Sequence, residues 1–172
     1  MRGALAETYA ALADDRLLSI YLNDHLAGSA VLRSRCRFTR ERHRGTDLGA
    51  FLDTLLGEID EDRFTLRGVM DAVGARESKA KAAAAAVAER AGRLKPNGRI
   101  LGYSPLSRLL ELELMSAGIE GKRLLWLSLH ELGDPRLAQF DFAALAARAQ
   151  AQRDGVERYR LPAARAALYE SK

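Results

Sequence analysis

The stretch that decides the fold is residues 46–74, TDLGAFLDTLLGEIDEDRFTLRGVMDAVG. Its apolar residues recur at alternating steps of four and three, which is the repeat of a helix packed along a seam. They are Leu48, Leu52, Leu55, Ile59, Leu66, Val69 and Val73. Thr46 is a favourable N-cap and Gly74 is a typical helix stop. The pattern predicts one helix of about 27 residues, roughly 40 Å long.

The one interruption of this seam is Asp62, which falls where the repeat requires an apolar side chain. A helix of this length needs partners of similar length to bury its apolar stripe. A carboxylate within that stripe needs cations or hydrogen-bond donors, because an unpaired buried charge is costly. Asp62 is therefore the first residue to consider for function.

Length, composition and charge limit the class of protein. The chain has 172 residues, of which 48% are hydrophobic and four are proline, and this suits a single domain over residues 1–172. The single cysteine, Cys36, excludes an internal disulfide and fits a reducing compartment. No apolar run reaches the length of about 18 residues that a membrane helix needs, and the start of the chain does not resemble a signal peptide. We therefore expect a cytoplasmic protein that has no membrane partner.

Three further long helices are predicted. The first covers about residues 5–38, and the short polar break over residues 40–45 makes it antiparallel to the second. Ser104 followed by Pro105 is a strong helix start, and the third helix is expected to reach Leu132. Its apolar stripe is assigned to Leu106, Leu109, Leu110, Leu114, Ala117, Leu124, Leu125 and Leu132, and Gly118 and Gly121 are the places where it could bend. The last helix is predicted from about residue 141 to 168.

Residues 75–103 form a long connection between the second and third helices, with a short alanine-rich helix inside it. A long connection at this place is the ferritin-like arrangement, whereas an up-down-up-down bundle has three short loops. The sequence therefore predicts an all-α, ferritin-like four-helix bundle. Because three sides of the third helix are apolar, we also expect Leu112, Met115 and Ile119 to be exposed and to form a homodimer surface.

Four segments carry a resemblance to a known family: YLNDHLAG (21–28), EIDEDR (58–63), GRILGYSPLSR (98–108) and ELE (111–113). With these segments the chain resembles the ferritin-like superfamily, and within it a bacterial group of uncharacterised function. Di-iron members of that superfamily use a Glu-x-x-His pair on each of two helices. Here Glu58 is followed by Glu61 and Glu157 by Arg160, so the resemblance implies the fold without a standard di-iron centre.

A metal site is the first functional hypothesis. Glu58 and Asp62 are one helical turn apart, and carboxylates with one imidazole suit iron, manganese or zinc. The candidate ligands are Asp24, His25, Glu58, Asp62, Glu111 and Glu113. The alternative is structural: these groups pair with basic side chains inside the bundle, with Arg63, Arg108 and Arg123 as candidates. We favour the structural alternative and expect no cofactor.

An arginine cluster is the second hypothesis. Residues 33–44 carry a net charge of +5, more than the +4 of the whole chain. Cations favour the C-terminal end of a helix, which is a structural use of this cluster. Its functional use would be to bind a phosphate group or nucleic acid, with Arg37, Arg40, Arg42 and Arg44 as the anion-binding residues. The scarcity of aromatic residues argues against nucleic acid as a partner.

Three functions therefore stay open. The absence of both Glu-x-x-His pairs favours a non-enzymatic bundle that acts by associating with itself, as a dimer, or with a partner. The second function is a metal-binding oxidoreductase or metal store, and the third is an anion or nucleic-acid binder.

Overall fold

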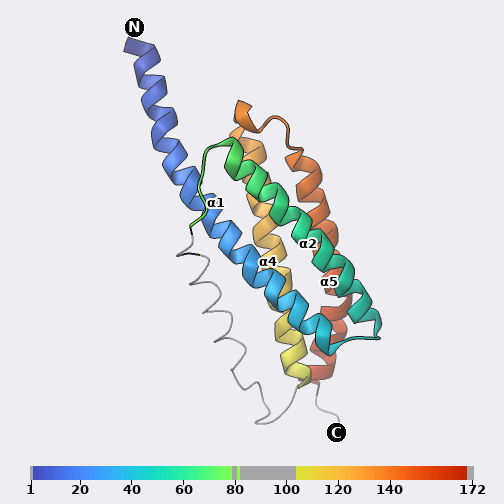
Figure 1. Cartoon of the computed structure of the whole chain (residues 1–172). Coiled ribbons are helices and arrows are strands. Elements are labelled where there is room, and N and C mark those ends of the chain that lie inside the picture. The colour runs from blue at the N-terminus through green and yellow to red at the C-terminus, as the bar shows by residue number, and fades with distance from the viewer. Residues whose placement is uncertain (1, 79–80, 82–103, 170–172) are drawn as a thin grey trace.

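Four long helices form the protein in a computed structural model that describes residues 2–78, 81 and 104–169, with side chains from residue 15 onward. They are α1 (Arg2–Arg42), α2 (Asp47–Ala72), α4 (Pro105–Leu132) and α5 (Phe142–Leu168), with a 3-10 turn, η1 (Pro135–Leu137), before α5. The residues described contain no strand. The all-α, four-helix bundle is therefore confirmed (Figure 1).

The helices pair in sequence order. α1 and α2 form one antiparallel hairpin, α4 and α5 form the other, and the hairpins meet where α1 lies beside α4 and α2 beside α5. α2 and α4 run in the same direction, so the chain must return along the whole bundle between them (Figure 1). The long crossover predicted over residues 75–103 has this role, but residues 79–80 and 82–103, with the predicted extra helix, lie outside the described part.

The helix ends follow the predicted capping chemistry. Thr46, Ser104 and Asp141 have extended or other non-helical backbone angles, and each side chain accepts a hydrogen bond from a backbone N–H of the turn that follows. Gly74 and Gly133 end α2 and α4 with positive φ angles of 72° and 61°, which glycine adopts without strain. α4 is continuous through both of its internal glycines.

The seam of α2 is the best-predicted part of the core. Every apolar residue of the repeat from Leu48 to Val69 is buried, and Asp62 is buried with them at 3% exposure. Opposite this seam, α1 contributes Leu22, Leu26, Leu32 and Cys36, and α5 contributes a face of small residues that includes Ala149 and Val156. α2 therefore lies in the bundle in the orientation that its sequence repeat specifies.

The face assigned to the third helix was only partly right, because Leu109 and Leu125 are the two of its eight residues that are buried. Leu112, Met115 and Ile119 are fully buried in the core, so they do not form an exposed dimer surface. Leu114 and Leu132, which were assigned to the buried stripe, are 57% and 51% exposed. The reason is that leucines occur on three sides of this helix, so the apolar pattern alone does not select one face.

α1 is much longer than its neighbours. It has 41 residues, whereas α2, α4 and α5 have 26, 28 and 27. Its first turns extend past the ends of the other helices (Figure 1). In the part of the chain that the structure describes, no helix has both the length and the apolar character of a membrane span.

The turn between α1 and α2 leaves no room for a side chain at Gly49. A Cβ there would lie 2.1 Å from the backbone oxygen of His43, which is far below van der Waals contact. We therefore expect Gly49→Ala to lower the free energy of unfolding by about 1–3 kcal/mol, because the turn must move. Chemical denaturation followed by circular dichroism measures this change.

Gly57 is the matched control on the same helix. A Cβ at Gly57 meets nothing within 4 Å, so Gly57→Ala should raise the free energy of unfolding by about 0.5–1 kcal/mol. Equal effects of the two substitutions would contradict a clash with the turn.

Candidate functional site

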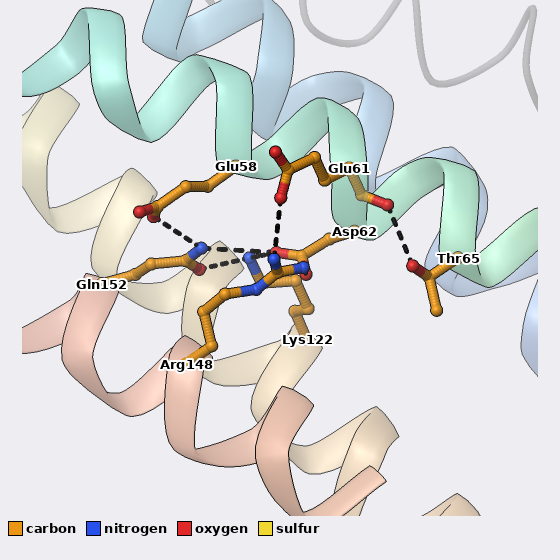
Figure 2. A network of polar contacts seen from close by, with 7 residues as sticks. All are labelled: Glu58, Glu61, Asp62, Thr65, Lys122, Arg148 and Gln152. Carbon is orange, nitrogen blue, oxygen red and sulfur yellow. Dashed lines mark hydrogen bonds and ion pairs between the residues drawn. The ribbon is translucent and has the colours of Figure 1, made fainter. Parts of the chain in front are cut away.

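A network of charged and polar side chains crosses the centre of the bundle (Figure 2). Asp62 on α2 is its central residue. Lys122 on α4 donates hydrogen bonds from Nζ to Asp62 Oδ2 and to Gln152 Oε1. Arg148 on α5 donates from Nη2 to Asp62 Oδ1. Three helices from the two hairpins are thus connected at one carboxylate.

Helix geometry explains why these side chains meet. Lys122 follows Ile119 by three residues on the buried face of α4, so its stem passes through the core. Arg148 and Gln152 are one turn apart on α5 and therefore lie on the same side of that helix. Lys122, Asp62 and Gln152 are all buried, with exposures of 9%, 3% and 4%.

Two glutamates extend the network toward solvent. Gln152 Nε2 donates to Glu58 Oε2 over 2.9 Å, and Arg148 Nη1 donates to Glu61 Oε2 over 2.8 Å. The Glu61 side chain is 68% exposed, so this edge contacts water. Three carboxylates and two cations give the network a net charge of about −1 when all five groups are ionised.

Burial and pairing act in opposite directions on the two cations. Burial lowers the pKa of Lys122, and its contact with Asp62 offsets part of that effect. For Arg148, burial alone would lower the pKa, but the hydrogen bonds and attraction from Asp62 and Glu61 outweigh burial and raise it. Asp62 therefore favours the charged form of both basic groups.

The chemistry available to Asp62 follows from these contacts. Each of its oxygens accepts a hydrogen bond from a cation, and Oδ2 also accepts one from Gln152 Nε2 over 3.4 Å, so a metal ion or a proton at this carboxylate would have to compete with two adjacent positive charges. We conclude that this carboxylate serves as an internal cross-link in the arrangement observed.

The predicted metal ligands occupy several separate places. Glu58 and Asp62 share the network, but Glu111 accepts a hydrogen bond from Thr39 Oγ1 over 2.9 Å in another part of the core. Glu113 lies 3.8 Å from Arg160. The six residues therefore do not converge on one point.

Asp24 and His25 complete the predicted set. Asp24 pairs with Lys81 over 2.6 Å, and His25 packs edge-on against Tyr21 with 4.6 Å between the ring centroids. Within the described ranges, no three side chains of His, Cys, Asp or Glu lie close enough to hold a metal ion together.

Most of the arginine cluster is engaged within the protein. Arg40 lies 3.1 Å from Glu41 and 3.3 Å from Asp53, and Arg44 also pairs with Glu41. The Arg42 guanidinium stacks over Phe38 at 4.5 Å from the ring centroid, whereas Arg37 is exposed. Arg37, Arg42 and Arg44 are exposed, so the anion-binding role of these residues stays a prediction.

The cations of the network were missed by the sequence reasoning. Arg63 Nη1 donates to Ser29 Oγ over 2.5 Å, and Arg123 pairs with Glu120 over 2.7 Å, so neither neutralises Asp62. The available signal was Lys122, three residues after Ile119 on the face that proves to be buried. It was overlooked because the buried face of that helix was misassigned.

No family model, no curated protein and no solved structure matches the chain.

The Asp62–Lys122 pair can be tested with a double-mutant cycle. Lys122→Met and Asp62→Leu should each lower the free energy of unfolding by about 3–5 kcal/mol, because each leaves an uncompensated charge in the core. The double variant removes both charges and should be more stable than either single variant. Urea denaturation of the four proteins measures the coupling.

Lys81→Met is the control for this cycle, because its partner Asp24 is exposed and the pair should contribute less than about 1 kcal/mol. Additive effects at Asp62 and Lys122 would contradict a direct buried pair.

His25 should make stability depend on pH. Burial lowers its pKa below the usual value of 6.5, and the nearby Asp24 only partly opposes this shift. At pH values below about 6.5, the unfolded chain therefore binds more protons at His25 than the folded chain does. The free energy of unfolding should fall between about pH 7 and about pH 5, and less steeply in His25→Gln. The exposed His130→Gln is the control, and equal slopes in the wild type and His25→Gln would overturn this prediction.

Proposed function

We propose that the chain is a ferritin-like bundle in which an internal ion-pair network takes the place of a metal centre, and that it acts by forming a homodimer. The observation that carries the first part is the pairing of the buried Asp62 with the two cations Lys122 and Arg148.

The topology supports the ferritin-like part of the proposal. Two helical hairpins are joined by a crossover between helices that run in the same direction, and this is how a ferritin-like bundle is connected. The same connection also brings polar side chains from different helices to the centre of the bundle.

Charge balance supports the absence of a metal centre. Carboxylates in the middle of a helical bundle need positive charge, which metal ions supply in di-iron proteins. Here the ammonium of Lys122 and the guanidinium of Arg148 supply that charge to Asp62 from α4 and α5. A metal ion at Asp62 would have to lie next to these cations, which electrostatic repulsion disfavours.

The long α1 supports self-association. Its first turns project beyond the other three helices, and a helix without packing partners is only marginally stable in water. A groove of about 910 Å³ lies where α1 leaves the bundle, between α1 and the end of α4. Leu17 and Leu132 line it and are 66% and 51% exposed. Because one surface carries both a projecting helix and an apolar groove, a second copy can pair with it through two-fold symmetry.

Sedimentation velocity of the full chain tests the dimer. We expect a dimer at micromolar concentration in the wild type, and a shift to monomer in Leu17→Glu and Leu132→Glu. Phe64→Glu is the control, because Phe64 is 79% exposed on α2, away from the groove. A monomeric wild type would refute the dimer, and so would a Phe64→Glu variant that dissociates as readily as the groove variants.

Elemental analysis of protein purified without chelators tests the ion-pair centre. We expect iron, manganese and zinc each well below one ion per chain. A stoichiometric metal that is lost in both Glu58→Ala and Asp62→Ala would overturn the proposal in favour of a metal protein.

A further inference from the structure

A cavity of about 260 Å³ lies between α1, α2 and α4, beside the ion-pair network and away from the groove at the end of α1. Most of its accessible lining is apolar surface, and four of its thirteen lining residues are Leu32, Ile59, Leu66 and Leu125. Polar groups enter it from three helices, among them His25, Arg63 and Lys122. A mostly apolar space with a few convergent polar groups is the usual form of a small-molecule site.

Two glycines line this cavity without a close neighbour. A Cβ at the exposed Gly28 or at Gly121 meets nothing within 4 Å, so a larger side chain fits at either position. Glycine inside a helix is less stable than alanine, and no contact in the structure requires it at these two places. Gly118 is different, because a Cβ there would lie 3.3 Å from the Leu32 side chain.

Within the described part of the chain, Arg63 is the charged group of this cavity that has no ion-pair partner. Its guanidinium is half-buried. Nη1 donates hydrogen bonds to the Leu26 carbonyl oxygen and to Ser29 Oγ, and both of these acceptors are neutral. The arginines on either side, Arg33 and Arg67, each have a carboxylate partner. Among the described residues, Asp60 and Glu77 attract Arg63 from a distance, but no carboxylate forms an ion pair with it.

The carboxylates that line the cavity are already neutralised. Asp62 is paired with Lys122 and Arg148, and Asp24 is paired with Lys81. Lys122 has three ammonium hydrogens and uses two of them on Asp62 and Gln152, so one stays available. Both basic groups in the wall can therefore donate hydrogen bonds to an anion.

We propose that this cavity binds a small monocarboxylate with a compact apolar body, with its carboxylate against Arg63 and its body among Leu66, Ile59 and Leu125. The volume agrees with this class of ligand. A cavity of about 150 Å³ holds benzene, so 260 Å³ accommodates one ring together with a carboxylate. A guanidinium binds a carboxylate with paired hydrogen bonds, which gives it a preference over neutral ligands of the same shape.

The test uses benzoate as the probe and benzamide as its neutral isostere. Isothermal titration calorimetry and amide chemical shifts of the full chain should show saturable binding of benzoate at one site, with shifts on α1, α2 and α4. Benzamide should bind at least about tenfold more weakly, because it lacks the charge-assisted hydrogen bond. Inorganic phosphate should not compete, because it has no apolar body.

Three variants locate the site. Gly121→Leu fills the cavity and should abolish benzoate binding, and Gly28→Leu closes it from α1 if the first variant is unstable. Arg63→Gln should reduce benzoate binding to the level of benzamide and leave benzamide unchanged. Arg67→Gln is the control, because Arg67 pairs with Glu77 and does not line the cavity.

Failure of benzoate to saturate the wild type would overturn the proposal. Unchanged binding in a folded cavity-filling variant would also overturn it, because the ligand would then bind elsewhere. Effective competition by phosphate would indicate a surface anion site and would refute an apolar-bodied ligand. None of these results depends on whether the protein forms a dimer.

Discussion

The carboxylate of Asp62 has to be neutralised inside the bundle, and the arrangement of the helices depends on how this is done. α2 carries Asp62 on its buried face, but the two cations come from α4 and α5 of the other hairpin. Each of its oxygens binds one of these cations, so a shift of either hairpin along the bundle axis would separate at least one charged pair. The network therefore opposes sliding of one hairpin along the other.

This register has an energetic cost that the surrounding contacts offset. Removing an ammonium, a guanidinium and a carboxylate from water is unfavourable, and mutual attraction repays it only when further hydrogen bonds satisfy the remaining donors and acceptors. Gln152 has that role, because its amide accepts from Lys122 and donates to Glu58. The network thus specifies one packing arrangement, and the apolar core supplies most of the stability.

Sequence reasoning succeeded where one local pattern determines the answer. The seam of α2 and the capping side chains of Thr46 and Ser104 were predicted correctly. The reason is that the residues of a helical repeat or a cap are only a few positions apart in the sequence. The buried face of α4 was not predicted, since its leucines surround the helix and only the tertiary fold selects Met115 over Leu114. The partners of Asp62 were missed for the same reason: Lys122 is 60 residues away in sequence.

The separation between the two hairpins also determines how the chain assembles. Each hairpin closes through a short local turn, whereas contacts between hairpins must wait for the crossover to bring them together. Asp62 meets Lys122 and Arg148 only across the contact between the two hairpins, so forming this contact removes water from Asp62 and aligns three charges. A misaligned encounter would bury a charge without its partner and would dissociate, which gives folding a checkpoint at the centre of the bundle.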